Sequence, residues 1–215
     1  LGARAGETMN RPVRIGFIGT GNRGTYGVIT SMCRNNNVEL YALADLFRDR
    51  IDKVLPHLNN LNKEKGLPHI EEKNIYVGKD AYLELLKDNN VDAVVIATPA
   101  YAHPFIFEAA VKAHKHVYCE KPLTHSVYES RLLTKLAAKN QVATSMGNQG
   151  SSGVGVETVC NWIWNGEIGE VTHVDAFTDR PIWPQGLMVP KEVHAIPDTL
   201  NWDLFLGPAK YRPYN

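Results

Sequence analysis

The stretch that decides the fold reads VRIGFIGTGNRG and occupies residues 13–24. Its first half is apolar and β-branched, which predicts a strand at 13–18. Glycines then follow with the spacing G-x-G-x-x-G, at Gly19, Gly21 and Gly24. Between a strand and a helix, the first glycine permits a tight turn, the second lets a pyrophosphate approach the backbone, and the third lets the helix pack on the strand. The stretch therefore predicts a phosphate-binding turn that opens a βαβ unit.

A carboxylate stands at the end of the next expected strand, 38–44. Asp45 follows the last glycine by about 20 residues, the spacing at which an acidic side chain can accept both ribose hydroxyls of an adenosine. Its charge would repel the 2′-phosphate of NADP, so the pattern favours NAD as the cofactor. Arg48 and Arg50 come soon after and could bind that phosphate. The alternative is a glycine turn kept for packing, with the carboxylate and both arginines solvated.

Short apolar runs alternate with helical patterns as far as Met146. Strands are expected at 13–18, 38–44, 75–77, 91–98, 116–120 and 142–146. Helices are expected at 23–35, 46–65, 80–90, 104–114 and 126–140. Pro56 is expected to kink or split the second of these helices. The alternation predicts the α/β class, with a doubly wound parallel sheet of the Rossmann type.

The pattern changes at the glycine- and serine-rich stretch 147–155. We interpret it as the boundary between a dinucleotide-binding Rossmann domain, 12–147, and the start of a second α/β domain for substrate binding or oligomerisation, 148–215. A helix through Trp162 and a strand at 170–179 are expected there. Because no later segment offers this strand a partner, we expect the second domain to be incomplete. The 215 residues alone are then expected to bind dinucleotide without turnover.

A second candidate site follows the fifth strand, where CEKPL occupies residues 119–123. Open parallel sheets bind their ligands at the carboxyl ends of the strands, so Lys121 is placed to meet a substrate. Beside a nicotinamide, its ammonium can hydrogen-bond a substrate oxygen and stabilise the alkoxide character that develops as hydride leaves carbon. Taken alone, the tripeptide EKP is more typical of a surface lysine before a proline that begins a helix.

Three motifs occur in one order: GFIGTGNRG at 16–24, ATPAYAH at 97–103 and KHVYCEKPL at 115–123. Together with IGEV at 168–171 and WDLFLGPA at 202–209, they resemble the Gfo/Idh/MocA family of nicotinamide-dependent oxidoreductases, and in particular its sugar dehydrogenases. The resemblance implies an N-terminal Rossmann domain and a C-terminal α/β domain with a large open sheet. Members commonly associate through that sheet, so a homo-oligomer is also implied.

For activity, the resemblance implies hydride transfer between NAD(P) and a hydroxyl of a carbohydrate substrate, a sugar, polyol or cyclitol. Two alternatives stay open. Some relatives hold NAD tightly and oxidise a sugar only transiently in order to cleave a glycoside, without net production of NADH. The third possibility is a dinucleotide-binding module without turnover. Lys121 argues against it for the whole protein, and it stays open for the isolated 215 residues.

The family's motifs assign Lys121 the catalytic role of orienting the substrate and assisting proton transfer. The cofactor-binding residues are then Gly19, Gly21, Asn22, Arg23, Gly24, Asp45, Thr98, Pro99, His103 and Glu120. Of these, His103 fits a helix cap or a packed residue as well as a cofactor contact. Candidate substrate contacts are Lys121, Asn148, Gln149, Arg180 and Trp183. The family's later Asp and His, which complete the proton relay, have no counterpart before Asn215.

Composition argues against several other classes of protein. Lysine plus arginine and aspartate plus glutamate number 23 each, so no net charge favours a nucleic acid partner. Apolar runs fall short of the roughly 18 residues of a membrane helix, and neither C-x-x-C pairs nor suitably spaced histidines suggest a metal. Residues 1–11 hold no apolar export signal, which favours a cytoplasmic protein, although a removed upstream signal stays open.

Overall fold

A computed structural model describes residues 11–180 and 184–215. These residues form two units. The first unit contains 11–147 and 197–210, and the second contains 148–180, 184–196 and 211–215. The parallel sheet expected from the sequence lies in the first unit.

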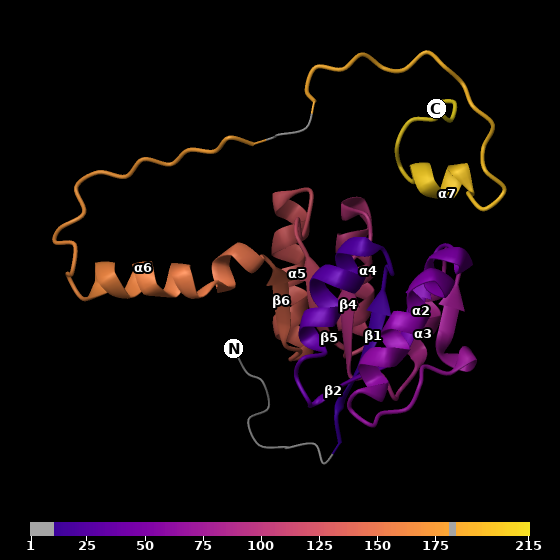
Figure 1. The fold of residues 1–215 in the computed structure, drawn as a ribbon, viewed down its shortest axis with the longest axis horizontal. Helices are drawn as coiled ribbons and strands as arrows, with labels where there is room; N and C mark the ends of the chain where they lie inside the picture. The colour runs from indigo at the N-terminus through magenta and orange to yellow at the C-terminus, as the bar shows by residue number, and fades with distance from the viewer. Residues whose placement is uncertain (1–10, 181–183) are drawn as a thin grey trace. The chain divides into compact units, whose positions relative to one another are not determined.

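The first unit is built on a six-stranded parallel sheet with the strand order β3-β2-β1-β4-β5-β6 (Figure 1). The strands are β1 (Val13–Ile18), β2 (Val38–Asp45), β3 (Ile75–Val77), β4 (Ala93–Ile96), β5 (His116–Glu120) and β6 (Thr144–Gly147). The chain builds outward from β1 in one direction and then from β4 in the other, which confirms the doubly wound Rossmann arrangement. Such sheets bind ligands at the carboxyl ends of the strands where the order reverses, here between β1 and β4.

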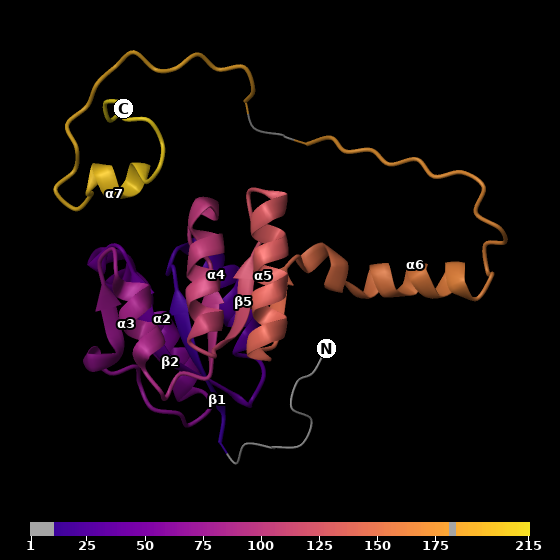
Figure 2. The ribbon, with the colours of Figure 1, turned by 180° about the vertical axis from the view of Figure 1, so that it is seen from behind.

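Helices cover both faces of the sheet. The helices of the first unit are η1 (Arg23–Ile29), α1 (Thr30–Met32), α2 (Arg48–Lys63), η2 (Glu72–Asn74), α3 (Ala81–Lys87), η3 (Ala100–Ala102), α4 (His103–Lys112), α5 (Val127–Asn140) and α7 (Trp202–Leu206). Apolar residues of η1, α1 and α2 form one core, and those of α3, α4 and α5 form the other. Figure 2 shows α4 and α5 side by side. The strand β4 gives Val95 to the first core and Val94 and Ile96 to the second, which explains its continuous apolar run.

The helix that follows the glycine turn begins as the π-helix η1 and continues as α1. Thr25 Oγ1 donates to the carbonyl oxygen of Thr20 (3.1 Å), and Thr30 Oγ1 donates to that of Thr25 (2.9 Å). Each bond spans five residues, which is the spacing of a π-helix. The two threonine hydroxyls therefore support the wide winding at the start of this helix.

The helix α2 continues through Pro56, so the predicted split does not occur. Ile51 and Val54 before the proline and Leu58 after it are all buried in one core. This packing outweighs the local cost of a proline inside a helix.

In the second unit, η4 (Gln149–Ser152) and α6 (Val154–Trp164) are helical, as expected for the segment through Trp162. The expectation of a strand at 170–179 is wrong, because residues 169–180 adopt neither helix nor strand. A strand needs a neighbour for its backbone hydrogen bonds, and the described residues of this unit provide none.

The segment 197–210 groups with the first unit, although the sequence places it in a second domain. Trp202 is buried, and its ring stacks on that of Phe205 with the centroids 5.5 Å apart. Gly207 approaches Tyr101 so closely that a Cβ added to the glycine would lie 2.6 Å from the tyrosine Oη. The approach of Gly207 to Tyr101 associates the end of α7 with the chain that follows β4.

Candidate active site

The three glycines of the turn have different structural tasks. Gly19 has a φ of +91°, and a Cβ there would lie 2.7 Å from the carbonyl oxygen of Ala97. A Cβ on Gly24 would lie 2.6 Å from the ring of Phe17, so this glycine lets η1 pack on β1. A Cβ on Gly21 would meet none of the described atoms within 4 Å. Gly21 therefore leaves the backbone open to a ligand, whereas the fold itself requires the other two.

Asn22 and Arg23 form the junction between the turn and η1. Within the described residues, the Asn22 side chain makes no capping hydrogen bond to the helix. The first N–H groups of a helix carry a partial positive charge that favours an anion. The backbone from Gly21 to Arg23 is therefore chemically suited to a pyrophosphate.

Asp45, the last residue of β2, fastens the glycine turn to the sheet. Its Oδ2 accepts hydrogen bonds from Thr20 N (2.7 Å) and Thr20 Oγ1 (2.9 Å), and its Oδ1 accepts one from Phe47 N (3.0 Å). An ionised carboxylate has about four acceptor positions, so capacity remains for a ribose hydroxyl. Sequence reasoning predicts the ribose contact and misses the tether to Thr20.

A cavity of about 880 Å³ follows the carboxyl ends of β1, β2 and β4. Its volume lies within the range of about 300–1,000 Å³ usual for small-molecule sites. Its lining includes the charged residues Asp45, Arg50, Lys79 and Asp203 and the aromatic residues Phe47, Tyr82, Tyr101, Phe105 and Phe205. The cavity thus joins the end of the glycine turn to an apolar, aromatic wall.

The two arginines after β2 occupy different environments. Arg48 forms ion pairs with Asp52 (2.7 Å) and with Glu72 on the protein surface. Arg50 lines the same cavity as Asp45. Of the two cations considered for a 2′-phosphate, Arg50 is therefore the one placed to meet it.

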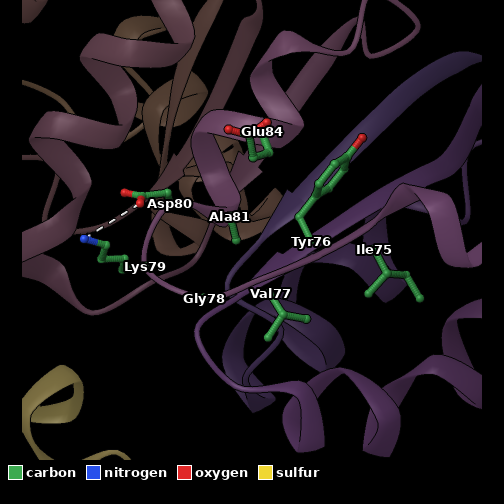
Figure 3. Close-up of a pocket in the computed structure, with 8 residues that line it drawn as sticks. All are labelled: Ile75, Tyr76, Val77, Gly78, Lys79, Asp80, Ala81 and Glu84. Carbon is green, nitrogen blue, oxygen red and sulfur yellow. Dashed lines mark ion pairs between the residues drawn. The ribbon is translucent and has the colours of Figure 1, made fainter.

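A smaller cavity of about 460 Å³ lies beside β3 (Figure 3). It is lined by Glu84 and by the turn between β3 and α3, and it shares Gly78, Lys79 and Ala81 with the larger cavity. Lys79 and Asp80 face each other there at 3.9 Å. Because these two charges pair with each other, we assign this cavity no separate function.

Thr98 and Pro99 follow β4 and line the larger cavity. The Thr98 hydroxyl is buried and has no hydrogen-bond partner within the described residues. A buried hydroxyl without a partner is unfavourable, so a ligand that supplies one would complete the site. This hydroxyl, the open backbone at Gly21 and the remaining acceptor capacity of Asp45 together fit a dinucleotide.

Glu120 and Lys121 stand at the carboxyl end of β5 with opposite exposures. Glu120 is 4% exposed, and its carboxylate accepts hydrogen bonds from Arg23 Nε (3.1 Å) and Tyr118 Oη (3.3 Å). Lys121 is exposed, and its peptide bond to Pro122 is cis. Lys121 is therefore the polar residue of this turn that a substrate can reach.

A family model described as "Oxidoreductase family, NAD-binding Rossmann fold" matches residues 13–148, which is more than half of the chain. The chain belongs to the Gfo/Idh/MocA family. The match confirms the family resemblance carried by the glycine, Thr-Pro and Glu-Lys-Pro motifs.

Curated proteins are similar over most of this chain. "Glycosyl hydrolase family 109 protein 1" from Shewanella sp. (strain MR-4) is 32% identical over 165 residues, which is 76% of this chain and 34% of that protein. A "Glycosyl hydrolase family 109 protein" from Shewanella sp. (strain W3-18-1) is 30% identical over the same length. The chain therefore spans about a third of the length of these curated relatives.

Solved structures share the fold. KijD10, a 3-ketoreductase from Actinomadura kijaniata solved with TDP-benzene and NADP, is 25% identical with a TM-score of 0.60, over 74% of this chain and 46% of that one. A probable dehydrogenase from Thermotoga maritima is 28% identical with a TM-score of 0.57, over 73% and 42%. The scyllo-inositol dehydrogenase of Lactobacillus casei, at 20% identity and a TM-score of 0.61 over 75% and 44%, is similar in fold.

Within this Gfo/Idh/MocA chain, some candidate residues converge and others do not. Gly19, Gly21, Asp45, Thr98 and Pro99 line one cavity. Asn22, Arg23, Gly24, His103, Glu120 and Lys121 belong to the same unit but not to the lining of that cavity. Asn148, Gln149 and Arg180 belong to the second unit, and Trp183 lies outside the described residues. The substrate roles of these four residues stay predictions.

His103 links the turns that follow β4 and β5. Its ring is buried, with Nδ1 2.7 Å from the carbonyl oxygen of Pro122 and Nε2 2.9 Å from that of Thr98. Both ring nitrogens are thus engaged by the main chain, which fits the packed histidine that the sequence leaves open. The turn that contains Thr98 and the turn that contains Lys121 are held together by this one side chain.

We expect His103→Phe to lower the free energy of unfolding by about 1–3 kcal/mol, because the buried ring would lose its hydrogen bond to a partly buried main-chain carbonyl oxygen of Thr98 or Pro122. Urea denaturation of the wild type and the variant measures the difference. His69→Phe is the matched control, since His69 is exposed. Equal stability of the wild type and His103→Phe would show that His103 does not hold the two turns.

The remaining groups of the site offer little other chemistry. Burial raises the pKa of the Cys119 thiol to about 12, so this neighbour of Glu120 stays protonated near neutral pH. Among the residues that the structure describes, no three His, Cys, Asp or Glu side chains come together as ligands for a metal ion.

In the described residues, no helix has both the length and the apolar character needed to cross a bilayer.

Proposed function

We propose that the protein binds NAD(P) and transfers a hydride between it and a hydroxyl of a sugar, polyol or cyclitol. The observation that carries the proposal is the position of Lys121, directly after β5 and at the sheet edge that also holds the glycine turn. In a doubly wound sheet this edge is where a cofactor and its substrate meet. Membership in an oxidoreductase family with an NAD-binding Rossmann fold supports the proposal.

The chain's own residues would divide the binding of the dinucleotide among three strand ends. The backbone at Gly21 and the start of η1 would hold the pyrophosphate, and Asp45 would accept hydrogen bonds from the adenosine ribose. The buried Thr98 hydroxyl would gain a partner from the bound molecule. When bound, the dinucleotide supplies the hydride donor or acceptor.

Lys121 would act on the substrate oxygen. Between the alcohol and the carbonyl form, that oxygen carries more negative charge in the transition state than in either ground state. An ammonium placed against it donates a hydrogen bond and stabilises this charge selectively, which raises the rate of the chemical step. The hydroxyl proton that leaves during oxidation would pass to solvent and would return from solvent during reduction, and we assign its transfer to no histidine of this chain.

Turnover with NAD and NADP on a panel of sugars, polyols and cyclitols tests the proposal. We expect reduced cofactor to accumulate together with an equal amount of oxidised carbohydrate. The test requires a protein in which the second domain is complete. If that protein binds the dinucleotide but oxidises no member of the panel, and reduces none of the matching ketones, the proposal is contradicted.

A second candidate function is glycoside cleavage by transient oxidation with retained NAD, and the relatives named glycosyl hydrolase family 109 proteins favour it. The same Lys121 could serve the oxidation that precedes cleavage. Release of a sugar from a glycoside with no accumulation of NADH would support this function over net dehydrogenation. Accumulation of NADH with an intact glycosidic bond would reject it.

We further propose that the substrate is a small carbohydrate contacted by Lys121, Asn148, Gln149, Arg180 and Trp183, and that the protein is a homo-oligomer. A tryptophan face and an arginine fork suit the apolar face and the hydroxyls of a sugar. Trp183→Ala and Arg180→Ala in the active protein test the substrate contacts through KM. Light scattering tests the oligomer.

For cofactor choice, we expect tighter binding of NAD than of NADP, because the Asp45 carboxylate in the cavity repels a 2′-phosphate. Asp45→Asn should narrow the difference by about 1–3 kcal/mol, while its remaining oxygen can still accept from Thr20. Titration calorimetry with both dinucleotides measures the effect, and Arg50→Ala serves as the comparison that should widen the difference. Equal affinities in the wild type would show that Arg50 outweighs Asp45.

A further inference from the structure

An ion pair crosses the edge of the sheet from the glycine turn to the Glu-Lys-Pro turn. Arg23 Nε donates to Glu120 Oε2 at 3.1 Å, and Arg23 Nη2 donates to Glu120 Oε1 at 3.4 Å. Arg23 begins the helix after β1, Glu120 ends β5, and β4 lies between these two strands in the sheet. The pair therefore spans the carboxyl end of β4, next to the point where the strand order reverses.

The surroundings leave space for this pair at both ends. A Cβ on Gly27 would lie 3.0 Å from Arg23 Nη1, so the absence of a side chain there lets the arginine lie along η1. A Cβ on Gly147, at the end of β6, would lie 2.5 Å from Glu120 Oε1. Tyr118 Oη donates to the same oxygen at 3.3 Å. Both η1 and β6 therefore have a glycine where a side chain would collide with the Arg23–Glu120 pair.

Burial makes the pair hard to separate. The Glu120 side chain is 5% exposed and that of Arg23 is 51% exposed. A buried carboxylate has lost its hydration and is strongly destabilised when its cationic partner is removed. A pyrophosphate bound at the glycine turn would have to break this pair to recruit the same two N–H groups of Arg23, whereas the backbone N–H groups of the turn are open to it.

We propose that Arg23 is a positioning residue. By fixing Glu120, it holds the end of β5 against which the nicotinamide half of a bound dinucleotide would lie. The neighbouring Lys121 is then aimed at the substrate beside that half, so displacing Glu120 weakens NAD binding, whereas removing the Lys121 side chain does not. The adenosine and pyrophosphate half depends on the backbone of the turn and on Asp45, not on the Arg23 side chain. The inference rests on the proposed binding of a dinucleotide.

Comparing ADP-ribose with NAD tests the inference through binding alone, because ADP-ribose lacks the nicotinamide. Calorimetry would compare the wild type with Arg23→Gln, Glu120→Gln and the double variant. We expect each single variant to bind ADP-ribose within about twofold of the wild type and to bind NAD on the order of tenfold more weakly. In the double variant, the loss should be no larger than in either single variant, since both substitutions break one interaction.

Arg14→Gln is the matched control. Arg14 also pairs with a buried glutamate, Glu39, at 3.1 Å, but it lies near the start of β1, away from the carboxyl edge. This variant should leave both affinities unchanged. Arg23→Lys keeps a cation and should recover part of the lost NAD affinity, and in the active protein Arg23→Gln should lower kcat more than it raises the KM of the carbohydrate.

Several outcomes would overturn the inference. Equal weakening of ADP-ribose and NAD by Arg23→Gln, with no effect of Glu120→Gln, would make Arg23 a direct pyrophosphate ligand. If the two losses of NAD affinity add in the double variant, Arg23 and Glu120 act independently and not as one pair. If Arg23→Gln fails to fold by circular dichroism, Arg23→Lys and Glu120→Asp carry the same comparison, and unchanged NAD affinity in both would reject the proposal. Failure of the wild type to bind ADP-ribose would instead contradict the proposed function itself.

Discussion

Lys121→Ala is expected to lower turnover about a hundredfold or more, the usual effect of removing a positioned acid–base group. The affinity for NAD should stay close to that of the wild type, because the glycine turn, Asp45 and Thr98 are untouched by the change. Steady-state kinetics with the substrate found in the carbohydrate panel, and calorimetry with NAD, measure the two effects separately.

The controls for this substitution separate charge from position. Lys121→Arg keeps a cation with a different shape and should retain only part of the activity. Lys112→Ala removes an exposed lysine of α4 that pairs with Glu108, and it should leave turnover unchanged. If Lys121→Ala turns over as fast as the wild type, the catalytic assignment of this lysine is wrong. Residues outside the Glu-Lys-Pro turn must then stabilise the charge on the substrate oxygen.

The second large effect is expected from Gly21→Ala, which should weaken dinucleotide binding about tenfold or more without altering stability. The added methyl group would meet no described atom within 4 Å, so the fold accommodates it, but it would occupy the space through which a pyrophosphate approaches the backbone. Calorimetry with ADP-ribose and urea denaturation measure binding and stability independently.

Gly24→Ala is the contrasting variant in the same turn. Its methyl group would lie 2.6 Å from the buried ring of Phe17 and 2.8 Å from Ala97 Cβ, so we expect a loss of about 1–3 kcal/mol in the free energy of unfolding.

Normal ADP-ribose binding by a folded Gly21→Ala protein would show that no phosphate approaches the chain at Gly21.

The sequence predicts the sheet well because residues close together in the chain are enough to indicate each strand and the glycine turn. The run VDAVVIAT is apolar at every position that faces either core. The glycine spacing can be recognised within six residues. The order of the strands then follows from the doubly wound pattern, in which the two halves of the sheet build outward in opposite directions.

Contacts between distant residues are harder to predict. Arg23 and Glu120 are 97 residues apart, and Thr20 and Asp45 are 25 apart, so no local pattern indicates that either pair forms a hydrogen bond. A charged residue beside a glycine motif is commonly solvated, and only the tertiary fold shows which carboxylate it meets. The sequence leaves the role of His103 open for the same reason, since both of its partners are main-chain oxygens.

The strand expected at 170–179 fails for a related reason. Alternating apolar and polar residues show that a segment would suit one face of a sheet, but the strand exists only when a neighbour supplies backbone hydrogen bonds. The first unit provides such neighbours for every one of its strands. The described residues of the second unit do not provide one for this segment.

The double use of Asp45 limits how this protein could be re-engineered for another cofactor. A designer who wants NADP would usually replace the acidic residue by a small one, to make room for the extra phosphate. Here such a change would also release Thr20 and Phe47, and the loosened loop is the one proposed to hold the pyrophosphate. A workable design keeps an acceptor at position 45, such as asparagine or serine, and leaves the attraction of the phosphate to Arg50, which already borders the cavity.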